Sequence, residues 1–197
     1  MNEKQIKDAL KNIENGVEKY IKIMNIFHNV NVSIDNEFQH LFKTYYQLKH
    51  RRINEFSNCY FTFMENHKKK IPSFICTLNN LYEFDRLEIS FASKLLATID
   101  PNLPIWDKYV KNYFGLESPP NDIVKREDKV IHANSLYEIL KQKYIEFFST
   151  DESNLLIKLF DEHYPNNNFT QIKKIDFIIY SNGNIESKQK RKKKKNI

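Results

Sequence analysis

Apolar residues recur at intervals of three and four along most of the chain, which is the periodicity of amphipathic α-helices. Ile6, Leu10, Ile13 and Val17 share one face of a first predicted helix. The same pattern predicts further helices around residues 38–48, 56–64, 74–81, 85–99, 105–114, 123–148, 155–164 and 171–180. Residues 30–34 can form a short extended piece, but no second strand is evident to pair with it. The pattern therefore predicts an all-α, compact domain of about nine helices.

The expected helix boundaries come from capping residues and from residues that end helices. Three aspartates precede apolar stripes and are predicted N-caps, namely Asp35, Asp85 and Asp151. Pro101 disfavours helical backbone in the residue before it, so a helix is expected to end there. Gly115 is expected to end the next helix, because glycine adopts left-handed backbone at little cost.

The C-terminal end differs from the rest of the chain in composition and charge. From Ser181 onward it is polar and of low complexity, so we expect residues 1–180 to form the helical domain and residues 181–197 a disordered tail. Residues 188–195 hold seven of the 31 Lys and Arg residues, which leaves 24 against 25 Asp and Glu elsewhere. The domain itself is thus close to neutral, and the tail is the segment expected to bind DNA or another polyanion.

Several classes of protein are disfavoured by composition. Three glycines argue against Gly-rich phosphate loops, and the two cysteines make neither a disulfide framework nor a metal-binding spacing. We therefore expect no metal, no metal cluster and no cofactor. The N-terminus has no apolar signal-peptide region and no run is long enough to span a bilayer, so we expect a cytoplasmic protein without a membrane partner. In a eukaryotic source the basic run would instead serve as a nuclear address.

Residues 88–116 contain the segment that carries candidate chemistry. An apolar helix is followed by a proline loop, the tetrapeptide Pro-Ile-Trp-Asp and a helix that ends in Phe-Gly-Leu. The segment resembles the helix-hairpin-helix DNA glycosylase superfamily, through Ala92, Leu95, Leu96, Pro104, Ile105, Asp107, Val110, Phe114, Gly115 and Leu116. It is also similar to a group of small bacterial proteins with the pattern ISFASKLLxxIxPxxPIWDxxV. The resemblance implies the two-lobed helical fold of those glycosylases.

The resemblance also implies a role for specific residues. Asp107 falls on the family's catalytic carboxylate, which stabilises positive charge on the sugar or activates water. A flipped, damaged or modified base would then be bound by Trp106 and Ser90. Tyr45 is a further candidate for binding the base, because Tyr45 and Tyr46 precede Arg51 by about one helical turn and can line a cleft with it. Ser90 stands near the place of the lysine nucleophile of bifunctional members, so the resemblance implies a monofunctional glycosylase. Lys94, one helical turn further on, matches that place poorly.

Basic residues outside and inside this segment are candidates for binding nucleic acid. We expect phosphate contacts from six of them, namely Arg51, Arg52, Arg86, Lys108, Lys111 and Arg191. Asp176 is a further candidate carboxylate, in the predicted helix over 171–180.

Other interpretations of these residues stay open. Asp107 can be a structural helix cap, and Trp106 can belong to the core. The segment NLYEFDRLEIS, where the family has its glycine-rich hairpin, contains no glycine. The protein can therefore be a catalytically inactive nucleic-acid-binding module, or a helical module that binds a protein partner, for instance in phage defence.

Overall fold

The computed structural model describes residues 1–48, 53–82, 87–120 and 123–195. Within these ranges the chain forms ten α-helices and no strand, which confirms the prediction of an all-α fold. The helices are α1 (Glu3–Lys11), α2 (Glu14–Asn29), α3 (Asn36–Tyr46), α4 (Ile53–Asn66), α5 (Phe74–Leu81), α6 (Ile89–Ile99), α7 (Lys108–Tyr113), α8 (Arg126–Phe148), α9 (Asp151–His163) and α10 (Gln171–Lys195).

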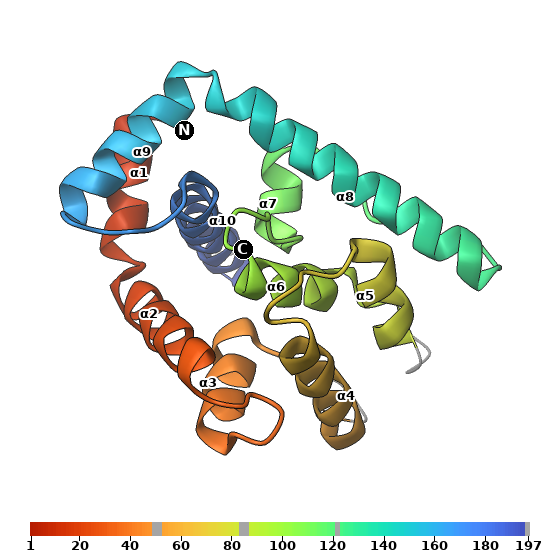
Figure 1. Ribbon diagram of the computed structural model, residues 1–197. Coiled ribbons are helices and arrows are strands. Elements are labelled where there is room, and N and C mark those ends of the chain that lie inside the picture. The colour runs from red at the N-terminus through yellow and green to blue at the C-terminus, as the bar shows by residue number, and fades with distance from the viewer. Residues whose placement is uncertain (49–52, 83–86, 121–122, 196–197) are drawn as a thin grey trace.

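Helix α10 lies near the middle of the molecule. In Figure 1 it is viewed nearly along its axis, with the other helices arranged around it. Helices α1, α7 and α9 pack directly against α10, while α2 packs on α3, and α5 packs on α4, α6 and α8. The first and last helices are therefore neighbours, although the C-terminal end of α10 projects beyond α1.

The first predicted helix is divided into two. Helix α1 ends at Lys11, where the Asn12 side chain donates a hydrogen bond to the Asp8 carbonyl oxygen at 2.8 Å. Helix α2 begins two residues later. Side-chain hydrogen bonds of asparagine to nearby backbone compete with helix continuation, which explains the break. The apolar positions on either side, from Ile6 to Val17, are all buried as the pattern predicts.

Some of the predicted helix boundaries are confirmed by the structure, and one is wrong by a single residue. Asp35 caps α3, with the Phe38 amide donating to Oδ1 at 2.7 Å, and α6 ends at Ile99 as expected. Gly115 has φ +66° directly after α7, which confirms its role as a terminator. The predicted cap Asp151 is wrong by one residue, because the Thr150 hydroxyl caps α9 instead. The predicted cap Asp85 lies outside the described residues.

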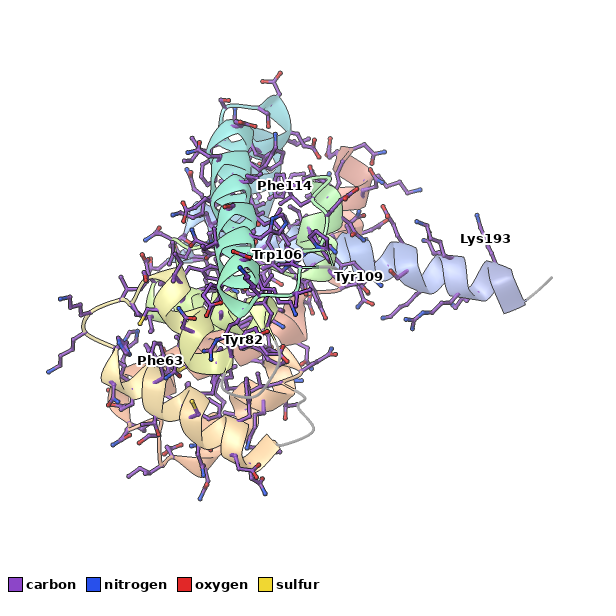
Figure 2. The ribbon with its side chains drawn as sticks, turned by 90° about the vertical axis from the view of Figure 1, so that its right-hand side faces the viewer. Phe63, Tyr82, Trp106, Tyr109, Phe114 and Lys193 are labelled. Carbon is purple, nitrogen blue, oxygen red and sulfur yellow. The ribbon has the colours of Figure 1, made fainter. Side chains whose placement is uncertain are left out.

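The chain after Ser181 differs from its expected disorder. Helix α10 continues without a break from Gln171 to Lys195, and Figure 2 shows its end, with Lys193, projecting from the body. Lysine, arginine, glutamine and glutamate are good helix formers, and positive charge at a helix C-terminus is favoured by the helix dipole. Low complexity and polarity alone therefore did not predict the local structure of this segment.

The core is dominated by aromatic side chains that hold the site-bearing elements in place. Phe42 on α3 packs against Tyr60 and Phe61 of α4, with ring centroids 5.7 and 5.5 Å apart. The Tyr60 hydroxyl donates to the Phe91 carbonyl oxygen at 2.9 Å, which ties α4 to α6. The Tyr137 hydroxyl of α8 donates to the Pro104 carbonyl oxygen at 2.9 Å. Buried aromatic hydroxyls thus anchor the backbone next to the site.

None of the helices in the described ranges is both long and apolar enough to cross a membrane.

Candidate functional site

A cavity of about 540 Å³ lies where α2, α3, α6 and α7 meet α10. Its lining comes from segments far apart in the sequence and combines aromatic rings with charged side chains. The lining residues are Asn12, Ile13, Gly16, Tyr45, Tyr46, Gln47, Lys94, Ile105, Asp107, Lys108, Tyr109, Val110, Lys173, Asp176, Phe177, Tyr180, Ser181, Asn184, Ile185 and Lys188. A cavity of this size fits a small organic ligand.

Asp107 stands on the wall of this cavity at the start of α7. The loop before it is held by the Trp106 amide, which donates to the Ser93 hydroxyl of α6 at 2.9 Å. The Tyr109 amide donates to Asp107 Oδ1 at 2.7 Å, so this oxygen caps the helix. The Asp107 residue is only half-buried, so solvent reaches part of it from the cavity. Asp107 is therefore both a helix cap and a carboxylate that a ligand can approach.

Lys94 on α6 reaches the same cavity. Its Nζ donates to the Tyr46 carbonyl oxygen at 3.1 Å and lies 5.4 Å from the centroid of the Phe91 ring. Burial lowers the pKa of Lys94, and the negative charges of Asp107 and Glu88 oppose that shift. The Lys94 ammonium group therefore interacts electrostatically with the Asp107 carboxylate. It contributes positive charge to a part of the cavity with little exposure to solvent.

Lys173 and Asp176, one helical turn apart on α10, form the buried part of the wall. Burial lowers the pKa of Lys173 to about 8, and the charge of Asp176 opposes this shift. Burial raises the pKa of Asp176 to about 7, and the charge of Lys173 opposes it. The Lys173 ammonium lies 4.2 Å from the ring centroid of Tyr20, a cation–π contact.

Asp176 has one satisfied oxygen and one unsatisfied oxygen. The Tyr144 hydroxyl of α8 donates to Oδ1. Burial raises the pKa of Tyr144 well above its usual range, so this hydroxyl stays protonated and remains a donor. Oδ2 is buried and has no hydrogen-bond partner among the described residues. The Ile105 backbone amide lies close enough to lower the pKa of Asp176. A ligand or a water in the cavity can complete the hydrogen bonding of this buried carboxyl group.

Aromatic rings cover much of the remaining wall. Tyr109 of α7 and Tyr180 of α10 meet edge to face, with ring centroids 5.4 Å apart. Tyr45 and Tyr46 come from α3, and Phe177 comes from the same helix as Tyr180. Rings of this kind can stack on a flat heterocycle.

Gly183 allows α10 to approach α7 closely. A Cβ atom at this position would meet three atoms of the Tyr109 side chain at 2.5, 2.7 and 2.8 Å. The backbone of Tyr109 holds Asp107 Oδ1, so Gly183 controls the spacing between α10 and the segment that positions the carboxylate.

The structure brings four of the predicted candidates together in the cavity wall, namely Asp107, Tyr45, Lys108 and the further candidate carboxylate Asp176. Trp106 is buried, with 7% of its surface exposed, and Ser90 is half-buried; neither lines the cavity. The expected base contacts from these two residues thus stay predictions without support from their position. Trp106 occupies the core position that the alternative interpretation assigned to it.

The predicted phosphate-binding residues are scattered. Lys108 lies on the cavity wall, while the Lys111 ammonium donates to the Ser118 hydroxyl at 2.5 Å outside it. Arg191 is exposed near the end of α10. Three others, Arg51, Arg52 and Arg86, lie outside the described residues.

Sequence analysis missed most of the contribution of α10. Lys173, Phe177, Tyr180 and Lys188 recur at spacings of three, four and eight residues on one helix face and line the cavity. The available signal was a set of polar and aromatic residues within an apolar helical stripe. That signal was missed because the helix was expected to end at Tyr180.

No group of His, Cys, Asp and Glu side chains in the described part of the chain is suited to hold a metal ion. Comparison of the chain with protein-family models, with curated proteins and with solved structures finds no match.

Proposed function

We propose that the cavity binds a damaged or modified base flipped out of DNA, and that the Asp107 carboxylate assists cleavage of its N-glycosidic bond. The proposal joins the resemblance of residues 88–116 to the helix-hairpin-helix glycosylases with one observation. Asp107 lines a cavity of about 540 Å³, where one of its oxygens is held by the Tyr109 amide at 2.7 Å. A carboxylate in that position is fixed in direction and open to a ligand.

The lining suits the two parts of a nucleotide. The rings of Tyr45, Tyr109 and Tyr180 offer flat apolar faces for a base. Four lysines face two aspartates, so the formal charge of the lining is +2 from Lys94, Lys108, Lys173, Lys188, Asp107 and Asp176. One of these positive charges, Lys188, comes from the basic run, and the other residues of the lining carry +1 within a domain that is otherwise close to neutral. Positive charge is thus present where a phosphate-bearing substrate would bind.

The chemistry requires little more than the carboxylate. When the bond between C1′ and the base nitrogen breaks, its electron pair leaves with the base and positive charge develops on the sugar. The Asp107 carboxylate stabilises that charge, and a water molecule adds to C1′ while its proton passes to Asp107. The departing base nitrogen takes up a proton from water, and Asp107 releases to water the proton it accepted, so the products are the free base and an abasic site. Lys94 donates to the Tyr46 carbonyl oxygen and acts in this proposal as a charge, so the reaction is monofunctional.

Asp107→Asn provides a sharp test, because asparagine caps a helix as well as aspartate does. The variant keeps the hydrogen bond from the Tyr109 amide and removes the charge. We expect base release from a panel of damaged and modified duplexes to fall by at least about two orders of magnitude, the size of effect seen when an electrostatic catalytic group is lost. The measurement is single-turnover release of base.

Asp35→Asn is the matched control. Asp35 caps α3 through the Phe38 amide at 2.7 Å, the same kind of local contact, and it does not line the cavity. We expect this variant to melt like wild type and to retain full activity. Equal activity of both variants and wild type would exclude Asp107 from the mechanism.

A non-catalytic nucleic-acid-binding module is the second candidate. The absence of glycine from the segment NLYEFDRLEIS favours it, because glycines let backbone amides approach a DNA phosphate in the family that residues 88–116 resemble. This candidate predicts binding to the same duplexes by wild type and by Asp107→Asn, with no base released by either. Release by wild type alone would reject it.

A further inference from the structure

One face of α10 forms a wall of the cavity along several turns. Lys173, Phe177, Tyr180, Asn184 and Lys188 all line it, and their spacings of four, three, four and four residues place them on one side of the helix. The wall thus runs from the buried half of α10 into the exposed half. Its last member is the first residue of the basic run.

The helical period carries this face onward into the basic run. At 3.6 residues per turn, Arg191 falls on the same side as Lys173 and Lys188, and Lys192 falls near its edge. Lys193 falls on the opposite side, and Lys190 lies about 100° around the helix from Arg191, away from the side of Lys188. The basic run therefore has a cavity-facing side and an outward side, although its composition is nearly uniform.

The direction of the exposed half is fixed by contacts at its base. The Ser181 hydroxyl donates to the Ala9 carbonyl oxygen of α1 at 2.9 Å. Gly183 packs against the Tyr109 side chain, and the Asn182 amide donates to Glu186 Oε1 at 3.0 Å. The helix continues without a break from the residues that line the cavity, and Figure 2 shows its end projecting from the body.

We propose that the ligand of this site is a polynucleotide strand, and that it lies along the cavity-facing side of α10 with its phosphates on Lys188 and Arg191. The proposal rests on the function proposed above and adds the path of the strand and the residues that bind its phosphates. Asn184 and Arg191 are about 10 Å apart along the helix axis, which equals roughly three nucleotide steps of a duplex strand. A free nucleotide would fill the cavity without reaching Arg191.

Charge complementarity favours a nucleic acid over an anionic membrane. Residues 188–195 contain no apolar side chain that could insert into a lipid surface. The exposed basic side instead continues into a cavity lined by aromatic rings, a combination typical of sites that bind single nucleic-acid strands. The helix thus presents phosphate-binding groups in line with a place for a base.

Two double variants of the full chain distinguish this proposal from the alternative that the basic run binds nucleic acid equally on all sides of the helix. Lys188→Ala with Arg191→Ala removes two charges from the cavity-facing side, and Lys190→Ala with Lys193→Ala removes two charges from the outward side at the same spacing. The probe is a fluorescent duplex with one central tetrahydrofuran abasic-site analogue, titrated by anisotropy at several salt concentrations.

We expect the cavity-facing pair to weaken binding strongly and to lower the slope of log affinity against log salt by about 1.8, the value for two lost phosphate contacts. The outward pair is expected to change the slope by much less. Equal losses in the two variants, or no loss in either, would overturn the proposal. The same variants are also titrated with vesicles that contain phosphatidylserine. Weaker binding to these vesicles with unchanged binding to the duplex would overturn the proposal as well.

The outcome can be separated from that of the proposed function. Base release by wild type, together with equal binding by the two double variants, would overturn the strand path and leave the glycosylase proposal standing. A difference between the two variants without any base release would support polynucleotide binding and reject catalysis.

Discussion

The two halves of α10 hold similar residues in opposite surroundings. In the first half, Lys173 and Asp176 are buried. Burial favours the neutral form of each side chain, so it lowers the pKa of Lys173 to about 8 and raises the pKa of Asp176 to about 7. In the second half, the basic residues from Lys188 to Lys193 are exposed. The first half is surrounded by other helices in Figure 1, and the second half projects from the body in Figure 2.

The difference shows that position along one helix, rather than residue type, decides what a charge can do. A buried lysine beside a buried aspartate shapes the local field of a cavity, at a cost in desolvation. An exposed lysine is screened by salt and acts through many weak contacts with a polyanion. Because the two halves share one helix face, the local site and the basic run belong to a single surface.

The largest expected contrast between the halves is in stability. Ile178 in the first half is fully buried, so Ile178→Ala should lower the free energy of unfolding by about 2–5 kcal/mol. Lys193→Ala in the second half should change it by less than about 0.5 kcal/mol. Urea denaturation of both variants measures this, and a similar loss in the two would contradict the division of α10.

The pH dependence of stability tests the buried half more finely. The pKa of Asp176 is raised from 3.8 to about 7, so the folded state binds this proton more tightly than the unfolded state does. The stability contributed by the protonated form is fully present below pH 3.8 and is lost as pH rises to about 7. Each tenfold difference in proton affinity corresponds to about 1.4 kcal/mol.

Wild type should therefore lose stability relative to Asp176→Asn between about pH 4 and pH 7. Lys173 acts in the same direction, because removal of the Asp176 charge lowers its pKa further in the variant. Thermal denaturation of the two proteins across this range measures the difference. If the melting temperatures of the two proteins changed in parallel with pH, Asp176 would not be in the proposed buried environment.

A smaller effect is expected at the joint between the two halves. Gly183→Ala should cost about 1–3 kcal/mol, because its Cβ would overlap the Tyr109 side chain. Gly16→Ala, a helical glycine on α2 with no atom within 4 Å of an added Cβ, should instead stabilise the protein by up to about 1 kcal/mol. Opposite shifts of the melting temperature are the expected result, and a gain at both positions would show that α10 and α7 can move apart freely.

The helices could largely be predicted from the chain, because burial imposes a periodicity that local sequence displays. The apolar stripe of the first helix and the terminator Gly115 were visible in this way. The break at Asn12 was not, because it depends on a single side chain that bonds to the backbone. The length of α10 was also missed, since a polar segment is compatible with a helix and with disorder alike.

Only some of the residues of the site could be predicted from the sequence. Asp107 and Tyr45 could be proposed from a motif and from a nearby aromatic pair. Asp176 could be named as a candidate carboxylate, but its place beside Asp107 could not be predicted. Asp176 and Lys173 lie about 70 residues from Asp107 along the chain and reach the same cavity only through the packing of α10 on α7. Local spacing contains no information about such a contact.

The most direct test of the account counts abasic sites in DNA, because this product is the same whichever base is released. Genomic DNA from cells exposed to alkylating or oxidising agents is incubated with wild type, Asp107→Asn or Asp35→Asn, and the aldehyde groups formed are labelled and counted. The account predicts that abasic sites accumulate with wild type and Asp35→Asn and stay at background with Asp107→Asn. Background levels with all three proteins, or equal accumulation with all three, would contradict it.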